Sequence, residues 1–227
     1  MAIMADASSL HLNLWKQHLA HVPDSVWQQT GLESLVLADN DLTEIPERIG
    51  ELKHLRMLDL GHNQLRELPE AIGKLESLTD FLYLHDNQLT SLPSSIERLK
   101  RLRYLNIGDN QFSTFPEAVS GVDHLIELRA SGNQLSSIPD SIAQLKSLRE
   151  LHLRNNQLEI LPSSIGALSE LRQIDLRGNP LTSLPAALAQ LPRLEKLDLR
   201  WVSAFSLPSE LPAWLSDLES RGCLVSR

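Results

Sequence analysis

The sequence lacks the features that would indicate a membrane-spanning, secreted or disulfide-bonded protein. It has one cysteine, Cys223, in 227 residues, so no disulfide can form within the chain. This favours a reducing compartment or a fold that needs no covalent bridges. No stretch approaches the roughly 18 to 20 consecutive apolar residues of a membrane-spanning helix, and residues 1–15 show no basic segment followed by an apolar one. We therefore expect a soluble, cytoplasmic protein without a secretory signal.

Positive charge is also scarce, and motifs for chemistry are missing. Lys and Arg number 21 against 29 Asp and Glu, a formal net charge of −8. Because phosphate binding needs a basic stripe, this excludes nucleic-acid binding over the whole surface. There is no glycine-rich phosphate loop and no nucleophile elbow, and the histidines show no metal-ligand spacing beyond a loose His18–His21 pair. We predict a protein that is not an enzyme and needs no cofactor or metal.

What the sequence has in abundance is a repeat of about 23 residues. Residues 148–170 read LRELHLRNNQLEILPSSIGALSE, and the same pattern returns when the window moves by 23 residues in either direction. The units span 9–31, 32–54, 55–77, 78–101, 102–124, 125–147, 148–170, 171–193 and 194 to about 217. Nine of the twelve prolines occupy one position of this repeat, from Pro23 to Pro208. Such a period is typical of a solenoid, in which each unit packs on its neighbours.

Each unit contains a short alternating segment that predicts a strand. In LHL, Leu151 and Leu153 are expected to face the core, and His152 the solvent. Strands of successive units would stack in parallel and line the concave side. The Leu-Pro step then turns the chain towards a short convex helix, whose first turn suits proline and acidic residues.

An asparagine follows the strand in the seven inner units. Its buried amide is expected to bond backbone groups of neighbouring turns, and its loss should cost about 1–3 kcal/mol. This predicted asparagine ladder consists of Asn40, Asn63, Asn87, Asn110, Asn133, Asn156 and Asn179.

The full pattern, LxxLxLxxNxLxxLPxxIGxLxx, resembles the leucine-rich repeat in its cytoplasmic 23-residue form. Similar units occur in Ras-group leucine-rich repeat scaffolds, in Roco proteins and in bacterial leucine-rich repeat proteins. The resemblance covers residues 9 to about 217 and implies a right-handed α/β solenoid, or horseshoe. In it, a parallel sheet lines the concave side and short helical or 3-10 segments lie on the convex side. It also implies protein binding, with a small GTPase or another signalling protein as a candidate partner class.

We predict a single domain over residues 1–227, and a monomer. Residues 1–8 are expected to be flexible, 9–31 to form an N-terminal capping repeat, and 32–193 seven regular repeats. Residues 194–227 should form a degenerate last repeat and a capping helix that ends near Gly222. The apolar face of that helix would carry Leu211, Trp214, Leu215 and Leu218.

Two units depart from the pattern. Unit 78–101 is one residue longer, which predicts a β-bulge that keeps the leucines in register or one that turns Phe81 or Tyr83 into a binding surface. The last unit has Val202 in place of the asparagine, as expected next to a cap. Trp201 could anchor a partner or pack on the cap.

Binding is predicted on the concave strand face, where aromatic, histidine and arginine side chains gather. The predicted partner-binding residues are Met57, Tyr83, His85, Tyr104, Arg129, His152, Arg154, Arg177, Arg200 and Trp201. Three of these arginines are consecutive in one column beside Asp175 and Asp198. They would form either solvated surface ion pairs or a docking site for an acidic segment.

Other candidates for chemistry are weak. His62, Asp86 and Asp109 fall in one predicted column, and a solvated polar edge is favoured there over a metal site. Cys223 has no motif around it and is expected to be a packed or idle thiol. The favoured function is thus a non-enzymatic protein-binding adaptor. The alternative is the recognition domain of a larger or exported protein, such as a bacterial effector or a signalling enzyme, with its catalytic part elsewhere.

Overall fold

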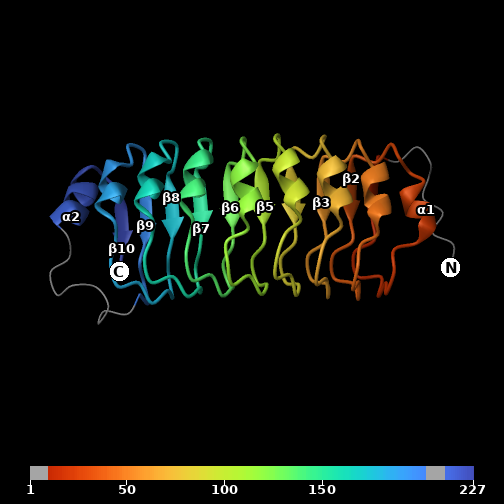
Figure 1. Cartoon of the computed structure of the whole chain (residues 1–227), viewed down its shortest axis with the longest axis horizontal. Coiled ribbons are helices and arrows are strands. Elements are labelled where there is room, and N and C mark those ends of the chain that lie inside the picture. The colour runs from red at the N-terminus through yellow and green to blue at the C-terminus, as the bar shows by residue number, and fades with distance from the viewer. Residues whose placement is uncertain (1–9, 203–212) are drawn as a thin grey trace.

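A computed structural model describes residues 10–202 and 213–227. Its described part is built on one sheet of ten parallel strands in sequence order, and the units lie side by side along the long axis of the molecule (Figure 1). The strands are β1 (His11–Asn13), β2 (Ser34–Val36), β3 (Met57–Asp59), β4 (Phe81–Tyr83), β5 (Tyr104–Asn106), β6 (Glu127–Arg129), β7 (Glu150–His152), β8 (Gln173–Asp175), β9 (Lys196–Asp198) and β10 (Leu224–Ser226). The predicted start at 1–8, Pro208 and Leu211 lie outside the described residues.

Short helical segments form the other layer. They are α1 (Asp24–Trp27), η1 (Glu47–Glu51), η2 (Glu70–Lys74), η3 (Ser94–Arg98), η4 (Glu117–Gly121), η5 (Asp140–Gln144), η6 (Ser163–Ala167), η7 (Ala186–Gln190) and α2 (Ala213–Ser220), where η marks a 3-10 helix. Each segment from α1 to η7 begins directly after the proline of its unit. The predicted solenoid, with a parallel sheet on one side and 3-10 turns on the other, is confirmed.

The acidic residue after the proline lies in the first turn of its own helix and also accepts hydrogen bonds from the next unit. Glu70 accepts hydrogen bonds from the amides of Ser94 (3.2 Å) and Ser95 (3.1 Å), at the start of η3. Glu47 accepts one from the amide of Ala71 in η2 (3.1 Å). Hydrogen bonds from Ser95 and Ser94 lower the pKa of Glu70 below its usual value. These carboxylates therefore connect neighbouring 3-10 helices, a role that the sequence pattern did not predict.

The core lies between the two layers and is almost entirely aliphatic. Leu151 and Leu153 are fully buried, and His152 on the opposite side of the strand keeps 14% of its side chain exposed. On the helical side the core is filled by Ile49, Ile72, Ile96, Val119, Ile142 and Ile165, each 0% exposed.

The asparagines join consecutive turns beneath the sheet. Asn133 shows the arrangement: its Nδ2 donates to the carbonyl oxygens of Ala130 (3.2 Å) and, one unit back, Ile107 (3.0 Å). Its Oδ1 accepts from the amide of Phe112, also one unit back (3.1 Å). All seven predicted ladder asparagines are buried and make the corresponding bonds.

The residue before each ladder asparagine, and before Gln17 and Val202 at the same position of the end units, has a left-handed backbone. The nine residues at this position have φ between 51° and 67°: Lys16, Asp39, His62, Asp86, Asp109, Gly132, Asn155, Gly178 and Trp201. Asp, Asn and Gly tolerate this region best, which explains why they prevail here. The column that contains His62, Asp86 and Asp109 is thus a column of tight turns.

The extra residue of unit 78–101 is absorbed just before β4. In the preceding unit the amides of Arg56 and the first strand residue, Met57, donate to one carbonyl oxygen, that of Glu33. In the longer unit the two corresponding amides belong to Thr79 and Asp80, and both residues precede β4. The pairing of Leu58 with Leu82 is kept, so the local irregularity leaves the core in register.

The C-terminal end differs from the prediction by one strand. Leu215 and Leu218 of α2 are 1% exposed, as expected for a capping helix. After it, Gly222 adopts a φ of +91° and the chain returns to pair β10 with β9. Cys223 lies in this turn, is 5% exposed, and burial raises the pKa of its thiol. In the part of the chain that is described, no helix is long and apolar enough to cross a membrane.

Candidate functional site

The outward side chains of the strands form the sheet face, whose two columns follow from the strand register. The first column contains Ser34, Met57, Phe81, Tyr104, Glu127, Glu150, Gln173 and Lys196. The second contains Val36, Asp59, Tyr83, Asn106, Arg129, His152, Asp175 and Asp198. Neighbouring strands in such a sheet are about 4.8 Å apart, so consecutive members of a column touch.

The middle of the sheet face carries an aromatic cluster, formed by Phe81, Tyr83 and Tyr104. The rings of Phe81 and Tyr83 stack at 5.6 Å between centroids, and Tyr104 lies 5.4 Å from Phe81 and 5.1 Å from Tyr83. Arg129 lies over the Tyr104 ring at 5.7 Å. Phe81 remains 42% exposed, and burial raises the pKa of Tyr104 to about 12. The cluster is held rigidly by its own contacts yet presents an apolar surface to solvent.

Two histidines support this cluster from the neighbouring turns. The His85 ring makes an edge contact with Tyr83 (6.0 Å) and lies over Gly61, where an added Cβ would come within 2.4 Å of it. Its Nε2 is 3.2 Å from Nε2 of His62, whose Nδ1 is 2.6 Å from Asp86 Oδ2. Burial and the neighbouring His62 lower the pKa of His85, which favours the neutral ring.

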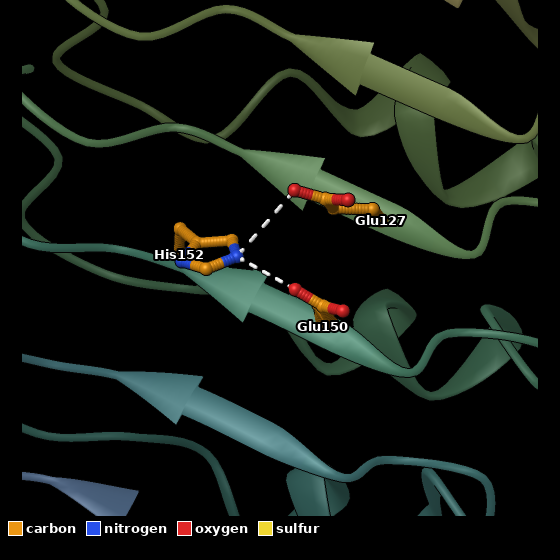
Figure 2. A group of neighbouring side chains, drawn as sticks. All are labelled: Glu127, Glu150 and His152. Carbon is orange, nitrogen blue, oxygen red and sulfur yellow. Dashed lines mark hydrogen bonds and ion pairs between the residues drawn. The ribbon is translucent and has the colours of Figure 1, made fainter.

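Next to the aromatic cluster lie Glu127, Glu150 and His152, which we call the carboxylate–histidine cluster (Figure 2). His152 Nε2 lies between the two carboxylates, 3.3 Å from Glu150 Oε2 and 3.6 Å from Glu127 Oε1. The ligand atoms lie within 4.8 Å of one another, so among the described residues these three could hold a metal ion. Arg129 Nε, however, donates to Glu127 Oε1 at 2.6 Å, so a cation already neutralises that carboxylate.

His62, Asp86 and Asp109, for which the sequence favoured a solvated polar edge over a metal site, do not come together in this way. His62 and Asp86 form a pair, and the three do not form a ligand group within the described part of the chain. All three residues lie at left-handed turns and are exposed.

The far end of the sheet face is rich in arginine. Asp175 and Asp198, which are 5% and 2% exposed, each receive two hydrogen bonds from the arginine two residues later, Arg177 and Arg200. The bonds from Arg200 lower the pKa of Asp198. Trp201 is 69% exposed, with both guanidinium groups 5.9 Å from its ring. Two of the three predicted arginines are thus occupied by carboxylates of the chain itself.

Arg154 differs from these two arginines. It is exposed, and no hydrogen bond or ion pair of its side chain is found within the described residues. It lines a shallow hollow of about 410 Å³ together with Arg129, His152, Arg177 and Lys196. Arg154 is therefore the member of the arginine column that remains free to meet a partner.

Three family descriptions match this chain. "Leucine-rich repeat region" matches residues 10–130, "Leucine Rich repeats (2 copies)" residues 123–166, and "Leucine rich repeat" residues 146–201. The first match alone spans more than half of the chain. The chain belongs to the leucine-rich repeat family.

Solved structures place this leucine-rich repeat domain among bacterial and plant relatives. A leucine-rich repeat protein of Leptospira interrogans is 30% identical, with 90% of this chain and 63% of that chain covered and a TM-score of 0.51. An internalin of Listeria monocytogenes shares the fold at 23% identity, with 95% of this chain and 60% of that chain covered and a TM-score of 0.79. The chain thus spans less than two thirds of either. No curated protein sequence gave a significant match.

Two further relatives were solved as complexes. The plant peptide hormone receptor RGFR1 in complex with RGF2 is 33% identical, with 79% of this chain and 30% of that chain covered and a TM-score of 0.69. The leucine-rich repeat ectodomain of an Arabidopsis thaliana membrane receptor kinase, in complex with Casparian strip integrity factor 2, is 28% identical. There 90% of this chain and 28% of that chain are covered, with a TM-score of 0.67. A domain of this family typically acts as a protein- or peptide-binding module and is usually non-catalytic.

The sequence-predicted site residues all lie on the sheet face of this leucine-rich repeat domain or at its rim, in two groups. Met57, Tyr83, His85, Tyr104 and Arg129 gather at or beside the aromatic cluster, whereas Arg154, Arg177, Arg200 and Trp201 lie at the arginine end, with His152 between the groups. The prediction missed Glu127 and Glu150 as members of the site. Both occupy the first outward position of their strands, where the strand register pairs them.

Proposed function

We propose that this leucine-rich repeat domain binds a protein or peptide partner across its sheet face, with the aromatic cluster as the centre of the interface. The observation that carries this proposal is the exposure of Phe81, 42% accessible, within a set of rings that already contact one another. Because the rings are ordered before binding, a partner loses little additional side-chain entropy in covering them. Aromatic and arginine side chains of this kind dominate the free energy of interfaces.

The test is affinity capture from a lysate of the source cells, read by mass spectrometry. The native chain is compared with a triple variant, Tyr83→Ala, Tyr104→Ala and Arg129→Ala, and with the control Ile160→Ala. Ile160 is 56% exposed and lies outside the strands, so its removal tests exposed apolar surface in general. A protein captured by the native chain and the control, but lost with the triple variant, supports the proposal. Equal capture by all three would show that the sheet face is not used.

We further propose, as the favoured setting, a cytoplasmic adaptor whose partner is a small GTPase or another signalling protein. Its one cysteine is buried and no disulfide is needed, which suits a reducing compartment. The second candidate is the recognition part of a larger or exported protein, which is supported by the greater length of the relatives. Immunoblotting of cytosol and culture medium separates the two. A band in the cytosol at the mass of this chain favours the adaptor, and a larger or secreted band favours the alternative.

A further inference from the structure

Beside the aromatic cluster, the segments that lead into the strands carry a concentration of positive charge. We call this surface the basic edge and define it by Arg101, Arg103, Lys146 and Arg149. These residues line a hollow of about 620 Å³, together with Arg56, His124 and Ile126. In a chain with a formal net charge of −8, such a local excess of cations is unexpected from composition alone.

Within the described residues, no carboxylate pairs with the cations of the basic edge. The two carboxylates in the hollow have other partners, since Asp80 pairs with Arg56 (3.4 Å) and Glu170 with Arg193 (2.5 Å). Lys146 donates to a carbonyl oxygen (3.2 Å), which leaves its charge uncompensated.

The three arginines of the basic edge are exposed, and their side chains have no hydrogen bond or ion pair within the described residues. This contrasts with Arg177 and Arg200, which are bound by Asp175 and Asp198.

The basic edge is continuous with the aromatic cluster. A second hollow, of about 360 Å³, is lined by Phe81, Tyr104 and Ile126 together with Asp80, Arg103 and Glu127. Asp80, Arg103 and Ile126 belong to both hollows, so one rim separates an apolar depression from a cationic one. A ligand seated on the aromatic cluster therefore meets Arg103 and Arg149 as soon as it extends over the edge.

We propose that this surface binds an acidic peptide segment: an apolar side chain enters the hollow at Phe81, Tyr104 and Ile126, and Asp or Glu residues pair with Arg103 and Arg149. The proposal rests on the proposed function and specifies the partner's chemistry. Arginine forks bind carboxylates through paired hydrogen bonds. Arg103 and Arg149 precede strands two positions apart in the sheet, about 9.6 Å, which an extended peptide spans in about three residues.

The experiment is selection of binders from a displayed library of short random peptides. We expect the enriched sequences to share an apolar residue with at least two acidic residues on one side of it, about three positions apart. The most enriched peptide is then synthesised with a fluorophore, and its affinity is measured by anisotropy. The double variant Arg103→Glu/Arg149→Glu should weaken binding by about tenfold or more, because two charge-assisted contacts become repulsive. Added salt should weaken binding to the native chain as well.

The matched control is Arg98→Glu, which reverses an exposed arginine on η3 that does not line the hollow of the basic edge, and should leave the affinity unchanged. Far-UV circular dichroism verifies that each variant is folded. Failure to enrich any peptide, enrichment of neutral or basic sequences, or an affinity unaffected by the double variant would each overturn the proposal. A peptide that loses binding with Tyr104→Ala but not with the double variant overturns this inference and leaves the proposed function standing. If a phosphoserine version binds while its Asp and Glu counterpart does not, the carboxylate assignment is wrong.

Discussion

Replacement of Asn133 by alanine tests the asparagine ladder and the accounting of its hydrogen bonds. Its side chain makes four bonds: Nδ2 donates to the carbonyl oxygens of Ile107, Ala130 and Ser131, and Oδ1 accepts from the amide of Phe112. The three carbonyl oxygens have other donors, namely Asn110, Asn156 and the amide of Asp109. The amide of Phe112, which is 0% exposed, keeps no acceptor.

The expected cost of Asn133→Ala is therefore that of one orphaned buried amide, about 1–3 kcal/mol, and not the sum of four bonds. Urea unfolding followed by far-UV circular dichroism measures the free energy of unfolding. Gln134→Ala is the matched control, because Gln134 is the exposed neighbour of Asn133 and its side chain should be replaceable within about 0.5 kcal/mol.

Asn179, the last asparagine of the ladder, allows a stricter test of this prediction. The carbonyl oxygen of Leu176 accepts from Asn179 (2.9 Å), and the next unit has Val202 where a further asparagine would share it. Within the described residues, Asn179→Ala thus leaves this carbonyl oxygen without a side-chain donor and the amide of Leu158 without its acceptor, and it should cost more than Asn133→Ala. Equal costs for the two asparagines, or no difference between Asn133→Ala and Gln134→Ala, would refute the reasoning.

Three further predictions concern the site and the C-terminal turn. Gly61→Ala should displace the His85 ring, because the new Cβ would lie 2.4 Å from it, and should weaken partner binding while the far-UV spectrum is retained. The chain has two tyrosines, so an absorbance titration should show less tyrosinate near pH 10.5 in the folded than in the unfolded chain, since the pKa of Tyr104 is about 12 and that of Tyr83 is raised. Both shifts raise the folded-state pKa, so stability should fall as the pH rises above about 10. Cys223, buried and with a raised thiol pKa, should react with a thiol reagent much more slowly in the folded chain than in urea; equal rates would contradict its burial.

The predicted and observed site differ in instructive ways. Outward positions such as Tyr83 and His152 followed from the period-two alternation, but the sequence could not show which neighbours would pair. Arg177 and Asp175 are two residues apart and on adjacent columns, so either an ion pair or two free groups was compatible with the pattern. The structure shows a bidentate pair on a nearly buried carboxylate. Among the described residues, Arg154 and the arginines of the basic edge are cations without such a partner.

The repeating residues alone were sufficient to predict the solenoid, the strand positions and the asparagine ladder. These features repeat in nine units that share one local geometry. A wrong register assigned to one unit therefore becomes visible when the unit is compared with the others. Only the folded structure shows the features that depend on a single contact between residues. It pairs β10 with β9 after the turn at Gly222, and it joins Phe81, Tyr83 and Tyr104 into one cluster. It also decides which carboxylates neutralise which arginines. Such contacts depend on side-chain conformations across neighbouring strands, which no periodic pattern encodes.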